Sequence, residues 1–236
     1  MASIDDQVPS KDPADDGTLA GAFRSIFKKL MQGVDGMLPA TVVSYDRVAN
    51  VATVKPMVQL LTTEGKTLPR ATVANVPVLA LGGGGFVINF PVMAGDFGWI
   101  EASDRDISLY MQSQTDAQPN TTRIHSFSDG RFIPDKMRNY VMPEDANAET
   151  DMIISSIDGM QAVIMQPSGV LVRAGRITAH ARIGADITSD SGDINISTGG
   201  NVNITGASVI INGIPFETHK HLDTQPGSGE SGGPTS

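Results

Sequence analysis

The 236-residue sequence contains no cysteine and few aromatic side chains. Without cysteine it can form no disulfide, thiolate nucleophile or cysteine-ligated metal centre. It also lacks an excess of basic charge. The formal net charge of −9 argues against nucleic-acid binding through phosphate contacts. The longest apolar stretch, residues 76–95, is interrupted by prolines and a glycine run. We therefore expect strands and a glycine loop there, and no membrane-spanning helix.

The few aromatic residues are unevenly distributed along the chain. All the Tyr and Trp residues and seven of the eight Phe lie at or before Tyr140, and only Phe216 follows. Residues 141–236 also hold 11 acidic and four basic side chains, a net charge of −7. The front part therefore has the composition of an ordinary globular core, whereas the rear part must pack with small aliphatic residues or not pack on itself.

The sequence predicts one helix near the N-terminus, after an acidic, disordered leader over residues 1–17. In residues 18–33 the apolar residues recur at helical spacing, with Thr18 as the N-cap and Gly33 at the end. The apolar face of this helix is expected to pack on its own domain or on a sister chain. Docking on a different protein and lying on a membrane surface are the alternatives.

Segments rich in β-branched residues follow the helix and predict a small barrel. They comprise residues 40–45, 51–61, 86–90 and 97–102, with a further hairpin turn expected at Glu64–Gly65. Short strands over about 100 residues suit an oligonucleotide/oligosaccharide-binding (OB) type barrel. The polar residues 142–151 are predicted to form a linker.

The rear part is repetitive, with a period near eight residues. Asp193–Ser197 is echoed by Asn201–Thr205 and then by Ser208–Asn212, with glycines between the blocks. This period is typical of a β-helix or β-prism, but the segment is too short for a solenoid of one chain. Three chains around one axis would supply the missing core. The residues expected to face that axis are Ile194, Ile196, Val202, Ile204 and Ile210.

A His-x-His motif, His219 and His221, follows the last repeat. On an extended backbone both imidazoles point to the same side. Two ligands hold a metal poorly, but three chains on an axis would offer six imidazoles in an octahedral arrangement. Zinc prefers four ligands, so such a site favours iron, nickel or cobalt. His125 and His180 are interpreted as structural, and Asp104-Arg105-Asp106 as a surface or interchain ion-pair cluster. No catalytic set is found, and no enzyme activity is expected.

In its order of elements, the chain resembles the central membrane-puncturing spike proteins of contractile-tailed bacteriophages. That order is a leader helix, a small barrel, eight-residue repeats, a His-x-His motif and a short Gly/Ser-rich end. The resemblance is most specific in the barrel, at residues 37–46 (MLPATVVSYD), 95–98 (GDFG), 104–107 (DRDI) and 132–134 (FIP). His219 and His221 match at the rear.

The resemblance implies an all-β homotrimer in four parts. These are a leader and short α-helix (1–36), an OB-like barrel (37–145), an intertwined triple-stranded β-helix needle (146–217) and a metal-binding tip with a Gly/Ser-rich end (218–236). It further implies one iron ion per trimer, held by His219 and His221 of each chain.

The same resemblance implies a location and a role. The protein would lie in the virion at the distal tip of the tail baseplate, seated on hub or tail-tube proteins through its N-terminal region. On sheath contraction it would pierce the host outer membrane, which it contacts only transiently at the cell envelope.

Two other classes remain open. A trimeric phage fibre or adhesin that binds a receptor would usually end in a bulkier, aromatic-bearing domain. A single-chain β-helix enzyme would need more coils and a carboxylate cluster.

Overall fold

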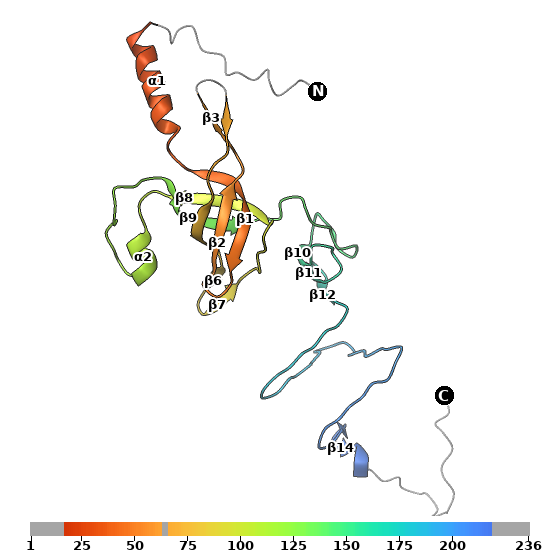
Figure 1. Ribbon diagram of the computed structural model, residues 1–236. Coiled ribbons are helices and arrows are strands. Elements are labelled where there is room, and N and C mark those ends of the chain that lie inside the picture. The colour runs from red at the N-terminus through yellow and green to blue at the C-terminus, as the bar shows by residue number, and fades with distance from the viewer. Residues whose placement is uncertain (1–16, 63–65, 219–236) are drawn as a thin grey trace, which may run out of the picture. The chain divides into compact units, whose positions relative to one another are not determined.

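The computed structural model describes residues 17–62 and 66–218. The chain divides into two compact units, the first ending at Ile177 and the second beginning at Thr178. Most of the regular structure is β, and it lies in the first unit (Figure 1).

The predicted helix is confirmed as α1 (Leu19–Met31). The Thr18 hydroxyl accepts a hydrogen bond from the Gly21 N–H at 3.0 Å, which caps one of the free donors of the first turn. Lys28 and Lys29 lie in the last turn, where positive charge interacts favourably with the helix dipole. Among the described residues, the large apolar side chains of α1 are all about half exposed or more, so the expected packing on its own domain is not seen there.

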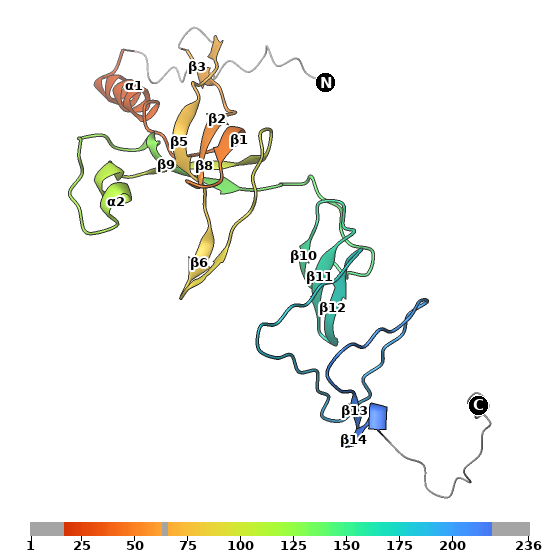
Figure 2. The same cartoon turned by 60° about the horizontal axis from the view of Figure 1, so that its bottom comes forward.

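The expected barrel is a nearly closed five-stranded sheet in the order β5-β2-β1-β8-β9 (Figure 2). The strands are β1 (Met37–Asp46), β2 (Val51–Pro56), β5 (Val73–Pro77), β8 (Phe97–Ser103) and β9 (Ser126–Pro134). Neighbouring strands pair antiparallel, and β1 carries a bulge between Val42 and Ser44. The two edges meet just after β5, where Val78 bridges Phe132 and the Leu79 N–H donates to the Phe132 carbonyl at 2.8 Å.

Alternate residues of these strands fill one core, because successive side chains of a strand point to opposite faces. Ala40, Val54, Ile100 and Phe132 are completely buried in it. The Phe132 ring lies directly against Gly98, where an added Cβ would come within 2.5 Å of the ring. The strands of the barrel therefore enclose a core of their own, with the Phe132 ring buried in it.

Two short hairpins extend from the barrel. β3 (Leu60–Leu61) pairs with β4 (Thr67–Leu68), and β6 (Leu81–Gly83) pairs with β7 (Phe86–Ile88). The turn expected at Glu64–Gly65 lies outside the described residues. The glycine run forms the turn of the second hairpin, with positive φ at Gly84 and Gly85.

Between β8 and β9 lies the six-residue helix α2 (Ser108–Ser113), which was not predicted. Its N-cap, Ile107, offers no side-chain hydrogen bond. The side chain of Asp106 instead accepts a hydrogen bond from the N–H of Ser108, the first residue of the helix, at 2.9 Å.

The first unit ends in a separate antiparallel sheet of β10 (Met152–Ser155), β11 (Ala162–Gln166) and β12 (Gly169–Arg173) (Figure 2). The residues before it are fixed by side chains of the sheet. Arg173 pairs with Asp145 at 2.5 Å, and Gln166 donates to the Asp151 carboxylate at 3.0 Å. The segment predicted as a linker thus carries defined hydrogen bonds to the sheet that follows it.

The second unit has little regular structure. From Thr178 to Val209, a stretch that is described throughout, the backbone forms no strand. β13 (Ile210–Ile211) then pairs with β14 (Ile214–Pro215), followed by the short 3-10 helix η3 (Phe216–Thr218). Glu217 accepts hydrogen bonds from the Val209 N–H and the Ser208 hydroxyl, both at 2.9 Å. The strands expected over 193–205 are absent from the single chain, because a strand needs a neighbouring strand for its backbone hydrogen bonds.

Candidate assembly surfaces

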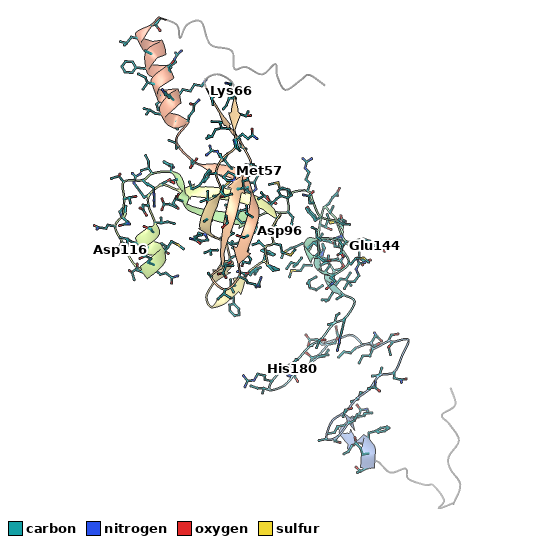
Figure 3. All side chains as sticks on the ribbon, viewed as in Figure 1. Met57, Lys66, Asp96, Asp116, Glu144 and His180 are labelled. Atoms are coloured by element: carbon teal, nitrogen blue, oxygen red, sulfur yellow. The ribbon has the colours of Figure 1, made fainter. Side chains whose placement is uncertain are left out.

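The predicted metal ligands His219 and His221 lie outside the described residues. Within residues 17–62 and 66–218, no three His, Asp or Glu side chains are grouped so that they could hold a metal ion. His180 stands on a stretch without helix or strand (Figure 3). His125 lies 3.7 Å from Asp104, and its carbonyl accepts a hydrogen bond from the Asp35 N–H. None of the helices in these ranges is long and apolar enough to cross a membrane.

The β10–β12 sheet carries a bare apolar face. Residues paired directly across an antiparallel sheet project from the same side. One row runs from Met152 through Met165 to Val170. The next row on that side runs from Ile154 through Val163 to Val172. We call these six side chains the apolar sheet face, and all of them are aliphatic or thioether groups without charge.

The two sides of this sheet differ sharply in exposure. On the opposite side, Ile164 is 0% exposed and Ala162 is also buried. On the apolar sheet face, Val170 is 65% exposed and Met152 is 57% exposed. Contiguous apolar surface of this kind is uncommon on a monomer and marks a contact with another molecule. Among the described residues, Ala162 and Ile164 are buried on one side of the sheet, whereas the apolar sheet face is half-buried to exposed.

The aliphatic side chains of the repeat segment are also exposed. The residues predicted to face an axis are all more than half exposed in the single chain: Ile194, Ile196, Val202, Ile204 and Ile210. Hydrogen bonds in this stretch include local turns, such as the Gly200 N–H donating to the Thr198 hydroxyl at 3.0 Å. These aliphatic side chains recur at a fixed period and find no core among the residues that the structure describes.

In the described part of the chain, Asp104, Arg105 and Asp106 do not form the surface or interchain ion-pair cluster that the sequence predicted. Arg105 contacts the Asp104 carbonyl, whereas the buried Asp106 is paired with Arg123 at 3.2 Å. Asp106 also accepts hydrogen bonds from the Ser108 N–H at 2.9 Å and the Thr121 hydroxyl at 2.6 Å. These hydrogen bonds, with the Arg123 charge, hold the pKa of Asp106 well below its usual range.

Arg123 links this carboxylate to the barrel. Its Nε and one terminal nitrogen donate to the two oxygens of Asp129 in β9, each at 3.0 Å. The cluster is therefore an anchor within one chain that ties the loop around α2 to β9. Sequence reasoning missed Arg123 because it lies 17 residues from Asp106, and no spacing rule connects the two.

The comparisons with known proteins concern the barrel. Residues 38–135 match the family model described as phage protein Gp138 N-terminal domain. The match supports a phage structural protein, and with it a location in the virion. No curated protein matches the chain. The Gp138 match begins in β1 and ends just after β9, so it spans the five-stranded sheet and stops before the apolar sheet face.

The sequence did contain a signal for the apolar sheet face. In MIIS, AVIMQ and GVLVR, apolar residues occupy both alternating positions of the strand. Strands that are apolar on both sides belong to sheets that are buried on both sides. In the described part of the chain, only the side that holds Ala162 and Ile164 is buried, so the pattern marks the other side as apolar surface.

Proposed function

We propose that this protein is the cell-puncturing spike at the tip of a contractile phage tail, and that it acts as a homotrimer. The observation that carries the proposal is the apolar sheet face at the start of the segment predicted to be the needle. In this proposal the barrel is of the OB type and sits on the baseplate hub or tail-tube proteins. Its match to a phage protein domain supports that placement in a virion.

The apolar sheet face explains why three chains would associate. A three-stranded sheet with one side in water and aliphatic groups on that side gains free energy when the side is covered. Three copies arranged about an axis would cover each other's faces with identical side chains. In the repeat segment, Ile196 and Ile204 of each chain would likewise meet about a three-fold axis.

A needle built this way suits mechanical work. Backbone hydrogen bonds that run between chains prevent one chain from leaving without breaking the ladder of the others. The net charge of −7 over residues 141–236 keeps the outer surface polar, so the needle does not remain in the bilayer it crosses.

The tip of the proposed needle would be closed by a metal. His219 and His221 from three chains provide six imidazole ligands for one ion, with iron as the expected metal. Metal binding at chain ends, where fraying is otherwise easiest, links the three chains together.

The first experiment tests the apolar sheet face. Val163→Asp places a carboxylate at the centre of the face, so three would meet at the axis. We expect the molar mass in solution to fall from that of three chains to that of one. The control Ser168→Asp adds the same charge in the exposed turn before β12 and is expected to leave the trimer intact. A Val163→Asp protein that stays trimeric would contradict the proposed interface.

The second experiment tests the place of the protein in the particle. Antibody against the chain should label the distal tip of the tail in the phage that encodes it. Labelling along lateral fibres would instead support the receptor-binding fibre and contradict the spike.

A further inference from the structure

The helix α1 carries an apolar face that no residue in the ranges 17–62 and 66–218 buries. The exposed fractions of its large apolar side chains run from 48% for Met31 to 75% for Leu19. An isolated helix of 13 residues is marginal in water, so most of its stability must come from packing. The strongly amphipathic pattern therefore requires a partner surface outside the single chain.

The spacing of this face is that of a coiled-coil seam. Leu19, Phe23, Ile26 and Leu30 follow one another at intervals of four, three and four residues. This is the alternation of d and a positions in a heptad, with Phe23 and Leu30 at a. Isoleucine at d next to leucine at a, as in Ile26 and Leu30, favours three- or four-stranded parallel bundles over dimers.

The charges of α1 are compatible with packing against copies of itself. Arg24 and Lys28 fall at positions b and f, away from the seam. In a parallel pair in register, a g residue faces the e residue five positions later in the neighbouring helix. Ala22 therefore meets Phe27, and Lys29 meets position 34, where the residue is Val34. No pair of like charges is brought together, and Ala22 with Phe27 widens the apolar contact.

Hydrogen bonds to the barrel hold the chain in place just after α1. Soon after α1, the Asp35 N–H donates to the His125 carbonyl at 2.9 Å, and Arg70 donates to the Asp35 carboxylate at 2.8 Å. The Gly36 carbonyl accepts from the Ala102 N–H at 2.9 Å. Only residues 32–34 separate the helix from this anchored segment. In a symmetric assembly, all copies of α1 would leave their barrels at one level and in one direction, at a high effective concentration.

We propose that the α1 helices of the assembled chains pack on one another as a parallel three-helix bundle at the N-terminal end. The occupant of the apolar face of α1 is thus a second and third copy of the same helix. This inference rests on the homotrimer proposed above. It adds a second interface, upstream of the barrel and separate from the apolar sheet face.

Single-cysteine variants of the full chain test the bundle directly, because the natural sequence has no cysteine. Ile26→Cys places a thiol at the d position of the seam, and the matched control Lys28→Cys places one at f, on the outer side. Under mild oxidation we expect Ile26→Cys to form disulfide-linked pairs of chains. At most two of every three chains can be linked, and the yield should not change on tenfold dilution. Lys28→Cys should stay unlinked under the same conditions.

Labelling with a maleimide provides a second measurement on the same variants. Before oxidation, the thiol of the Ile26→Cys variant should react at least several-fold more slowly than the thiol of the Lys28→Cys control, because the seam position is enclosed in the bundle. Equal cross-linking or equal labelling rates for the two variants would overturn the bundle and leave α1 open for a different protein or a membrane. Molar mass separates the two proposals. A trimer without selective linking overturns only the bundle, whereas a monomeric chain overturns the bundle and the homotrimer together.

Discussion

The barrel and the segment that follows it use the same aliphatic residues with opposite results. In the barrel, Val54, Ile100 and their neighbours are enclosed by the strands of one chain. In residues 152–211, similar side chains line the apolar sheet face and the repeats, and one chain leaves most of them exposed. The difference lies in topology. Five strands can close on themselves into a barrel, whereas a sheet of three strands and a narrow repeat cannot enclose both of their sides.

The substitution with the largest expected effect disrupts assembly through the rear region and leaves the barrel folded. Ile204→Asp would bring three carboxylates together in an apolar shaft, at a cost of several kcal/mol per charge. We expect the chains not to assemble, while the barrel still folds. The fluorescence of Trp99, the single tryptophan, reports on the barrel because this residue lies in β8 with its Nε1 donating to Asp135 at 2.8 Å.

The matched control is Asn203→Asp, which adds the same charge to the neighbouring residue on the other side of the expected strand. It should assemble like the wild type. A trimer from Ile204→Asp together with failure of Asn203→Asp would show that the faces of the repeat are reversed.

The substitution with the second-largest expected effect destabilises the barrel alone. Phe132→Ala removes the largest fully buried side chain and should lower the free energy of unfolding of the barrel by about 3–5 kcal/mol. Phe132→Leu should cost less, because it leaves a smaller cavity. Urea unfolding followed by Trp99 fluorescence measures both. An unchanged midpoint for Phe132→Ala would mean that the five-stranded sheet does not enclose this ring.

The third expected effect is on the pH dependence of the stability of the barrel. Because the pKa of Asp106 is lower in the folded barrel than in the unfolded chain, its ionised form stabilises the fold above the ordinary carboxyl pKa of about 3.9. This contribution decreases as the pH falls below that value and is lost completely only when the pH falls through the lower pKa of the folded state. Asp106→Asn should therefore lower the melting temperature of the barrel at pH 7 and have a smaller effect near pH 3.

The exposed Asp116 on the same loop provides the control for the acid experiment. Asp116→Asn should leave the melting temperature nearly unchanged at both pH values. Equal losses at pH 7 and pH 3 for Asp106→Asn would point to a role for the side chain other than its charge.

The smallest effect on folding is expected at the tip. The double variant His219→Ala, His221→Ala should lose the metal and keep the trimer, since the proposed core lies upstream. Elemental analysis of the wild type should give one metal per three chains. Retention should weaken as the pH drops below the His pKa of about 6.5, because protonated imidazoles cannot bind. Full metal content in the double variant would place the site elsewhere.

Local signals accounted for the elements whose causes lie near them in sequence. Thr18 and the apolar spacing predicted α1, and the glycine run predicted the β6–β7 turn. The contact of Arg123 with Asp106 and Asp129 was not predictable, because it depends on how the barrel closes. The strands expected over 193–205 depend on hydrogen-bond partners that a single chain does not supply. For the same reason, the spacing of α1 predicts an apolar face but does not decide between its own domain and a sister chain as the surface that covers it.

The molar mass of the wild-type protein in solution tests the central claim most directly. Multi-angle light scattering should give about three times the chain mass of 24.8 kDa, at concentrations well below those that favour chance association. A mass of one chain, with residues 152–211 exposed to solvent as in the isolated chain, would contradict the claim that the rear region obtains its core from sister chains.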